Sequence, residues 1–443
     1  MLNLPTAAIS VIEILQQNGF EAFAVGGCVR DALMGKACHD IDITTDALPE
    51  QVACAFGNYP VIPTGIKHGT VTVMIKNEPV EITTYRTEGE YTDLRRPDKV
   101  SFVGDIRMDL ARRDFTINAI CYNPQMGVCD YQQGCEDVKN KVIRCVGQAR
   151  KRFSEDPLRI LRGLRFSSVL EFSIENATEK AMFEMAPLLK NVSGERLLCE
   201  MSKLLCGKGI KEVLLKYSDI LSVIIPEIKA MKNFKQNNPH HIYDVLTHTA
   251  VALENTPPEE ILRFAVLLHD IGKPFCYTQD EKGVGHFYRH PKLSEKISET
   301  VMNRLKADNN MKKVVCFLVL NHDVSIPPTE KSVKRALNKY GYDMLIMLLK
   351  VKRADNYAQN IKDYNRRKEY DLLDEIIDKI LFEKMCFSLK DLAVNGDDLI
   401  LAGVPKGKRI GEGLNLLLEQ VIDEKIQNEK SALLVYTKGH LLK

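Results

Sequence analysis

The chain has 443 residues, enough for about three domains of ordinary size. With 45% hydrophobic and 27% charged residues, it has the composition of a folded globular protein, which excludes a disordered or collagen-like chain. The net charge is only +2, so any contact with nucleic acid has to come from local basic surfaces. The twelve cysteines include no C-x-x-C pair, and no run reaches the roughly 20 apolar residues of a membrane span. We therefore expect reduced thiols in a cytoplasmic protein without a secretion signal or a membrane segment.

The front of the chain predicts a region of mixed α and β structure. Apolar residues at helical spacing predict a helix over residues 6–18, which ends at Asn18 and Gly19. β-Branched and alternating stretches predict strands over residues 22–25, 39–44, 69–75 and 79–85. The polar stretch 88–103 predicts a loop.

The rest of the chain predicts helices. Strand signals fade from about residue 155, and helical periodicity dominates from there to the end. Composition shifts indicate domain boundaries near residues 145 and 230 and within the charged stretch 345–365. The predicted fold class is therefore α+β, with a mixed sheet and helices first and an all-helical remainder.

Two carboxylates stand on one face of a predicted strand. Asp40 and Asp42 flank Ile41, and alternate residues of a strand project to the same side. Such a pair can hold one Mg²⁺ ion and leave the ion's remaining positions to water and phosphate oxygens. Glu81, on another predicted strand, is either a third carboxylate of this group or a surface residue of an edge strand.

A glycine pair separates the first predicted strand from a helical stretch. Gly26 and Gly27 lack the G-x-G-x-x-G spacing of a dinucleotide site. They are either a bare turn or a cradle for a triphosphate, in which Gly27 lets the backbone approach and Arg30 donates to phosphate.

Three ordered blocks carry a family resemblance. They are the stretch 26–31 followed by Asp40-x-Asp42, the stretch 112–120, and the stretch 155–166. Together they resemble the class II nucleotidyltransferases, the family of tRNA CCA-adding enzymes and bacterial poly(A) polymerases. The resemblance implies that Arg113 contacts the nucleotide's ribose and phosphates. It also implies a helix that reads the base and contacts the nucleotide through Asp156, Arg159, Arg162 and Arg165. As neighbours at i and i+3, Asp156 and Arg159 could equally be a surface salt bridge.

The resemblance implies a reaction and its partners. A 3′-hydroxyl of tRNA would attack the α-phosphate of CTP or ATP, with Asp40 and Asp42 holding Mg²⁺, and Arg30 and Arg113 steadying the triphosphate. Glu81 is a third ligand or a base. A poly(A) polymerase is the alternative, which the stretch 64–70 and the tail disfavour because they resemble the CCA-adding form. The segment 88–103, with Arg95-Arg96-Pro97, resembles the loop needed for A addition and so disfavours a CC-only enzyme.

A second set of residues lies in the helical half and resembles the HD phosphohydrolase superfamily. It begins with His248 and the stretch His269-Asp270-Ile271-Gly272-Lys273. The candidate metal ligands that the resemblance implies are His248, His269, Asp270, His290 and Asp323, with His286 as a further candidate. Imidazole together with carboxylate favours a divalent transition metal. The site either hydrolyses phosphate esters or persists as a scaffold that holds tRNA. A third interpretation makes the whole chain an HD-type metal phosphohydrolase acting on RNA ends or nucleotides.

These assignments predict four domains. They are a nucleotidyltransferase head over residues 1–145, a helical neck with the base-reading motif over 146–230, an HD-type domain over 231–350, and a helical tRNA-binding tail over 351–443. In the tail, the basic turn at residues 406–409 precedes an apolar helix and is either a phosphate contact or a solvated loop.

Overall fold

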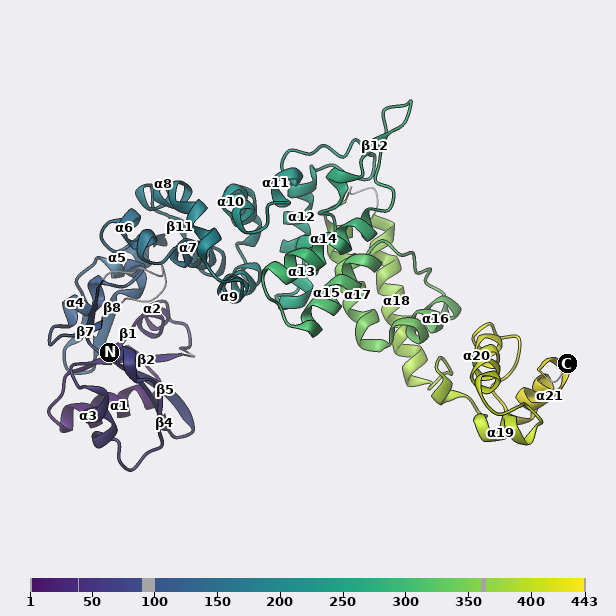
Figure 1. The fold of residues 1–443 in the computed structure, drawn as a ribbon, viewed down its shortest axis with the longest axis horizontal. Helices are drawn as coiled ribbons and strands as arrows, with labels where there is room; N and C mark the ends of the chain where they lie inside the picture. Colours follow the sequence, from purple (N-terminus) through teal and green to yellow (C-terminus); the bar gives the residue numbers. More distant parts are fainter. Residues whose placement is uncertain (1, 39, 90–99, 360–363, 442–443) are drawn as a thin grey trace. The chain divides into compact units, whose positions relative to one another are not determined.

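The chain divides into two compact units in the computed structural model, which describes residues 2–38, 40–89, 100–359 and 364–441. Unit 1 consists of residues 1–230 and 301–307, and unit 2 of residues 231–300 and 308–443 (Figure 1). Among the described helices, none is both long and apolar enough to cross a membrane. An N-terminal mixed sheet is followed by a mostly helical remainder, which confirms the predicted α+β class.

Unit 1 begins with a seven-stranded sheet in the order β3-β4-β5-β2-β1-β8-β9. Its strands are β1 (Ala22–Val25), β2 (Ile41–Thr45), β3 (Val61–Gly65), β4 (Thr70–Ile75), β5 (Glu78–Thr84), β8 (Ile120–Asn123) and β9 (Gly127–Asp130). The strands β2 and β5 run parallel, whereas β1 lies antiparallel to both of its neighbours. Five helices belong to this region: α1 (Thr6–Gln17), α2 (Gly27–Leu33), α3 (Pro49–Ala55), α4 (Ile106–Ala111) and α5 (Gly134–Asn140). The buried face of α1 packs on β1 and β2 through Val11, Ile12 and Leu15.

The four strands predicted for this region are present with bounds shifted by at most two residues, but the loop prediction for residues 88–103 was partly wrong. Its two flanks pair as strands β6 (Arg86–Glu88) and β7 (Val100–Phe102). The triplet Arg95-Arg96-Pro97 lies outside the described residues. The strands β3, β8 and β9 had no prediction. Strand β2 begins at Ile41, so that Asp40 directly precedes it.

Helices complete unit 1: α6 (Ala149–Glu155), α7 (Leu158–Leu170), α8 (Asn176–Met185), α9 (Gly194–Leu205), α10 (Ile210–Ile224) and α11 (Ile228–Met231), with the small parallel pair β10 (Val142–Ile143) and β11 (Ser173–Ile174). Asp156 lies between α6 and α7 in an extended conformation, not on one helix with Arg159 as expected. Pro157 explains the break, since a proline disfavours helical geometry in the residue before it.

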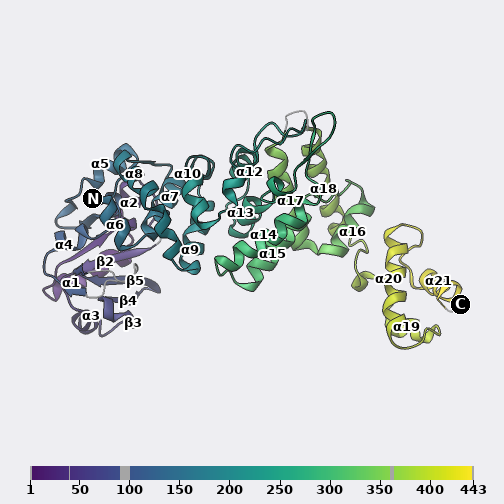
Figure 2. The ribbon, with the colours of Figure 1, turned by 45° about the horizontal axis from the view of Figure 1, so that its top comes forward.

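Unit 2 is a helical body followed by a small helical tail (Figure 2). The body contains α12 (Val245–Glu254), α13 (Glu260–Leu268), α14 (His290–Arg304), α15 (Asn309–Asn321), α16 (Glu330–Tyr340), α17 (Tyr342–Tyr357) and α18 (Tyr364–Phe382), and the short hairpin β12 (Thr278–Gln279) and β13 (Gly285–His286). The last four residues of α14, 301–304, are counted with unit 1. The tail contains α19 (Gly396–Leu401), α20 (Lys408–Ile422) and α21 (Lys430–His440) around its own apolar core. The domain boundary predicted at residue 350 falls inside α17, and α16, α17 and α18 share one buried cluster.

Candidate functional site

The first group of functional side chains lies where β2 and β5 run side by side. Asp42 and Glu81 are register partners in this parallel pair, so their side chains leave the sheet on the same face. Burial raises the pKa of Asp42 against the lowering effect of the Arg113 charge. Burial, followed by the charges of Asp42 and Asp40, raises the pKa of Glu81. Three mutually repelling carboxylates at one point of a sheet form a set of hard oxygen donors of the kind that divalent cations such as Mg²⁺ bind.

Gly26 brings the backbone against this carboxylate group. It has a φ of 77°, a left-handed conformation that favours glycine. A Cβ atom there would lie 3.3 Å from Arg113 Nη1 and 3.8 Å from Asp42 Oδ2. Arg113 thus lies beside both the glycine turn and Asp42, and Asp109 holds its guanidinium at 3.4 Å. The turn, a cation and a carboxylate meet at one place, as a nucleotide triphosphate with its metal requires.

Arg30, a predicted ligand of the triphosphate, makes hydrogen bonds within unit 1. It is buried, its Nη1 donates to Asn118 Oδ1 at 2.7 Å, and its Nε donates to Asp31 Oδ1 at 2.9 Å. The bond to Asn118 ties α2 to the short turn that precedes β8. Binding of the triphosphate by Arg30 stays a prediction.

The arginines of α7 are held by buried carboxylates. Arg162 Nε donates to Asp114 Oδ2 at 2.7 Å, and Arg165 Nε lies 3.3 Å from Glu200 Oε2. Burial alone would raise the pKa of Asp114, but the charge and hydrogen bond of Arg162, followed by the charge of Arg159, lower it to about 2. Asp114 is therefore ionised at neutral pH and fixes the orientation of Arg162.

Phe166 lies among three of the predicted nucleotide-binding arginines. The guanidinium carbons of Arg165, Arg30 and Arg162 lie 4.2, 5.3 and 5.5 Å from its ring centroid. An aromatic ring attracts cations to its face. Phe166 thus gathers these arginines next to the sheet, although they come from two helices far apart in the sequence.

The two remaining base-reading candidates, Asp156 and Arg159, do not pair with each other as their spacing predicts. Asp156 Oδ2 accepts a hydrogen bond from Arg196 Nη2 of α9 at 2.7 Å. Arg159 Nη1 donates to Glu155 Oε2 at 2.6 Å. A residue of α9 thus holds the carboxylate of Asp156 in place. The other three candidates, Arg159, Arg162 and Arg165, lie on α7, which begins two residues after Asp156.

A second group of side chains lies in unit 2, where histidines from four places in the chain converge. His248, His269, Asp270 and Asp355 form one set whose ligand atoms all lie within 4.8 Å of one another. Asp270, His290 and His322 form a second set, which shares Asp270 with the first. Every one of these six positions is buried except Asp355, which is partly buried.

The outer nitrogens of the four histidines make one recurring contact. Each Nδ1 lies within hydrogen-bond distance of a backbone carbonyl: Ala358 for His248, Val266 for His269, Phe287 for His290 and Val319 for His322. An Nδ1–H that donates to a carbonyl leaves Nε2 with its lone pair, which is the form that binds a metal. The shared arrangement orients four Nε2 atoms towards the carboxylates of Asp270 and Asp355.

Buried polar atoms at the centre fit a metal site. Among the described residues, Nε2 of His269 and both carboxylate oxygens of Asp270 make no hydrogen bond of good geometry. Burial would raise the pKa of Asp270, but the charges of His269 and Lys273 hold it well below its usual range. An ionised, buried carboxylate among imidazoles would be a suitable ligand for a divalent transition metal.

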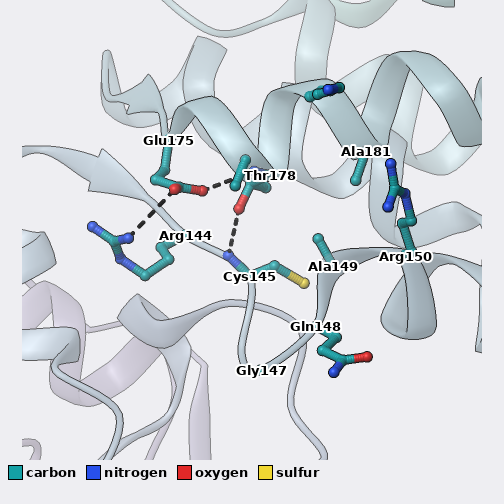
Figure 3. Close-up of a pocket in the computed structure, with 11 residues that line it drawn as sticks. Arg144, Cys145, Gly147, Gln148, Ala149, Arg150, Glu175, Thr178 and Ala181 are labelled. Atoms are coloured by element: carbon teal, nitrogen blue, oxygen red, sulfur yellow. Dashed lines mark hydrogen bonds and ion pairs between the residues drawn. The ribbon is translucent and has the colours of Figure 1, made fainter.

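A separate cavity of about 640 Å³ lies in unit 1 (Figure 3). Cys145, Gln148 and Thr178 are among its lining residues, and none of the predicted site residues lines it. Its two arginines are already neutralised, since Arg144 pairs with Asp137 and Glu175, and Arg150 with Glu184. This cavity therefore offers less positive charge to an anion than its composition indicates.

Comparisons with known proteins find relatives for both units. The model of the poly(A) polymerase head domain matches residues 22–144, that of the probable RNA and SrmB-binding site of polymerase A matches 171–232, and that of tRNA nucleotidyltransferase domain 2 matches 277–436. The CCA-adding enzyme of Lactobacillus helveticus is 33% identical over 433 residues, which cover 97% of this chain and 96% of the relative. The chain belongs to the CCA-adding enzyme family. It is a nucleotidyltransferase, which confirms the resemblance seen in its motifs.

Two further CCA-adding enzymes extend the likeness along the whole chain. That of Streptococcus suis is 30% identical over 444 residues, covering 99% of this chain and 98% of the relative. The crystal structure of the Bacillus stearothermophilus CCA-adding enzyme in complex with CTP is 27% identical, covers 97% of this chain and 96% of its own, and superposes with a TM-score of 0.74.

Within this CCA-adding fold, the structure brings most of the predicted residues together but changes the HD-type set. Asp355 takes the place in the cluster that the prediction gave to Asp323, and His322 joins it. Asp323 lines the adjoining pocket, as does His286, and neither belongs to the two sets. His322 precedes the predicted residue by one position at the end of α15, so the two side chains point in different directions.

Several residues of both sites had no prediction. Glu200 is buried beside Arg162 and Arg165, and Arg196 holds Asp156. A signal for Glu200 exists in its sequence, because a glutamate on the apolar face of an amphipathic helix has to find a buried cation. Asp355 lies in a charged stretch and has no such signal.

Proposed function

We propose that this chain adds or repairs the 3′-terminal CCA of tRNA from CTP and ATP without a nucleic-acid template. The observation that carries the proposal is the carboxylate group at β2 and β5, with Asp42 and Glu81 in register and Arg113 beside the glycine turn. Whole-length relatives named CCA-adding enzymes support it. The twelve free cysteines are consistent with a cytoplasmic location.

The carboxylates fit a divalent cation, and we assign Asp40 and Asp42 to hold Mg²⁺. When bound, Mg²⁺ lowers the pKa of the attacking 3′-hydroxyl and neutralises charge on the phosphate oxygens. We assign Glu81, whose pKa is raised by burial and by the charges of Asp42 and Asp40, as a third ligand or a base beside Asp42. Arg113 stabilises the triphosphate, and the glycine turn at Gly26 and Gly27 lets the phosphates approach the backbone.

We assign recognition of the base to the block on α7 and its N-terminal turn. Asp156, held by Arg196, offers carboxylate oxygens to an amino group, and Arg159 and Arg162 offer guanidinium donors to ring and carbonyl acceptors. Arg165 supports this surface through its contact with Phe166. The fixed hydrogen bonds of Asp114 and Glu155 keep these donors in one orientation, as selection by hydrogen bonding demands.

The test is incorporation of CTP into a tRNA that lacks its last three nucleotides. Because metal-held charge stabilisation supplies several kcal/mol, we expect Asp42→Asn to lower the rate by at least about a hundredfold. Glu78→Gln is the matched control, since Glu78 is exposed on the same strand and on the opposite face from Glu81. An Asp42→Asn enzyme with the wild-type rate would contradict the assignment.

A poly(A) polymerase is the alternative within the same reaction class. It shares the carboxylates and the glycine turn but adds A without a limit. The whole-length relatives, which are named CCA-adding enzymes, favour the proposed function.

A second candidate function is favoured by the histidine cluster of unit 2. We propose that it is an HD-type site that binds divalent transition metal through His248, His269, Asp270, His290, His322 and Asp355, and that it hydrolyses phosphate esters. A bound metal of this kind activates water for attack on phosphorus. The test is phosphate release with Mn²⁺, together with the metal content of the protein. His269→Ala should lower both, and unchanged metal content would contradict the site.

A further inference from the structure

Two thiols lie next to each other beside the carboxylate group of unit 1. Cys28 is in the first turn of α2, directly after the glycine turn, and is 1% exposed. Cys38 lies beyond the end of α2, two residues before Asp40, and is partly buried. The side chains of Cys28 and Cys38 hydrogen-bond to each other. The pair therefore connects the glycine turn to the residues that lead into β2.

A tight turn at the end of α2 brings the two cysteines together. The helix ends at Leu33, and Gly35 follows with a φ of 69°, a left-handed conformation that favours glycine. The N–H of Lys36 donates to the carbonyl oxygen of Asp31 at 2.8 Å, a bond that closes this turn. The chain thus reverses its direction after the helix, and Cys38 returns to the first turn of α2.

Cys38 also contacts a residue that we assign to hold Mg²⁺. Its Sγ donates to the backbone carbonyl oxygen of Asp40 at 3.3 Å. A disulfide between Cys28 and Cys38 would remove both thiol protons, so this hydrogen bond would be lost. The two sulfurs would also move from a hydrogen-bond separation to about 2.05 Å. Because a displacement of about 1 Å in a catalytic site can lower the rate about a hundredfold, such a bond would act on catalysis through Asp40.

The two cysteines differ in their access to solvent. Cys38 is partly exposed and can meet a dissolved oxidant, whereas Cys28 is enclosed and can be reached through Cys38. Cysteines that sense oxidants are accessible and often lie next to a second cysteine that completes the disulfide. Disulfides of cytoplasmic proteins are usually transient bonds of this kind.

We propose that Cys28 and Cys38 are a modification site, at which a small-molecule disulfide converts the two thiols into a reversible protein disulfide that lowers the rate of nucleotide transfer. The inference rests on the proposed function of the carboxylate group. The bond would displace Asp40 and hold the glycine turn and the start of β2 in a less active arrangement.

The reaction consists of two thiol–disulfide exchanges. The sulfur of Cys38 attacks one sulfur of the oxidant, the S–S bond of the oxidant breaks, and one half leaves as a thiol with the proton of Cys38. The sulfur of Cys28 then attacks that of Cys38, the mixed disulfide breaks, and the second half leaves as a thiol with the proton of Cys28. Two protein thiols are thus oxidised by two electrons, and one molecule of the oxidant is reduced to two thiols.

The experiment compares the full-length protein before and after incubation with hydroxyethyl disulfide. This oxidant is neutral, which suits a thiol that lies near the charges of Asp31, Asp42 and Asp40. The rate measured is that of CTP incorporation into a tRNA that lacks its last three nucleotides. We expect the wild-type rate to fall at least about tenfold and to return with dithiothreitol. An undiminished rate in protein that carries the disulfide overturns the proposal.

Two serine variants assign the effect to this pair, each compared with its own untreated form. Cys38→Ser should keep its rate in the oxidant because Cys28 loses its partner. Cys129→Ser is the matched control, since Cys121 and Cys129 are register partners of β8 and β9 and form a second close pair of thiols in unit 1. It should lose its rate as the wild type does. A sensitive Cys38→Ser or a resistant Cys129→Ser overturns the proposal.

Peptide mapping separates this inference from the proposed function. The treated wild-type protein is digested without reductant, and its peptides are identified by mass. Peptides joined through Cys28 and Cys38 support the site, and their absence overturns it. If the untreated wild-type protein incorporates no CTP, the proposed function fails, and this mapping still decides whether the disulfide forms.

Discussion

Replacing Asp114 by asparagine removes one buried charge and keeps the shape of the side chain. In the wild type, Arg162 lowers the pKa of this carboxyl from its ordinary value of 3.8 to about 2, although burial opposes the shift. At about 1.36 kcal/mol per pKa unit, the depressed pKa corresponds to about 2 kcal/mol of stability at neutral pH. We expect the free energy of unfolding to fall by about that amount in Asp114→Asn. The charge of Arg162 is then left with Glu200 at 3.6 Å as its remaining carboxylate partner.

The assay is urea unfolding of the full chain, followed by circular dichroism, in wild type and variant. Because the folded-state pKa is depressed, the stabilisation is present above pH 3.8 and is lost as the pH falls towards about 2. The difference between the two proteins should therefore stay constant down to about pH 5 and shrink below about pH 4. Asp105→Asn is the control, since its ion pair with Arg107 is exposed. An Asp114→Asn protein as stable as the wild type at neutral pH would refute the reasoning.

Three further changes probe other parts of the account. Gly26→Ala places a methyl group 3.3 Å from Arg113 Nη1 at a position with positive φ. We therefore expect the free energy of unfolding to fall by about 1–2 kcal/mol and the KM for CTP to rise. An unchanged KM would contradict binding of the triphosphate at the glycine turn. Arg196→Met frees Asp156 and should reduce the discrimination between CTP and ATP, measured as the ratio of their incorporation rates, whereas an unaltered ratio counts against base reading by Asp156. His269→Ala should lower the number of Mn²⁺ ions bound in equilibrium dialysis, and wild-type binding would argue against the cluster.

Local patterns predict the elements of unit 1 better than their pairing. Alternating residues place β2 and β5 within two residues of the observed bounds, because strand periodicity is visible in a short stretch. That Asp42 and Glu81 would stand in register depends on the parallel pairing of these strands, which no local pattern encodes. The break at Asp156, in contrast, has a local cause, which is Pro157. It was not predicted because the residues on both sides of it have helical periodicity.

In the histidine cluster, too, some residues can be predicted from the sequence and others cannot. The pair His269 and Asp270 is visible as a motif, but Asp355 joins it only through the packing of α17 against α12 and α13. Whether His322 or Asp323 faces the cluster depends on the rotation of the end of α15. Helical periodicity predicts that end only to within about one residue. Sequence therefore predicts which chemistry is present more reliably than which of two neighbours performs it.

The length of the product made from a tRNA lacking its last three nucleotides tests whether this chain adds CCA. The purified protein is incubated with Mg²⁺ and with CTP, ATP or both, and the products are resolved at single-nucleotide resolution. We expect growth by CC with CTP alone and by CCA, and no further, with both. Long A-tails would identify a poly(A) polymerase, and no extension with any nucleotide would contradict the assignment of the carboxylates at β2 and β5.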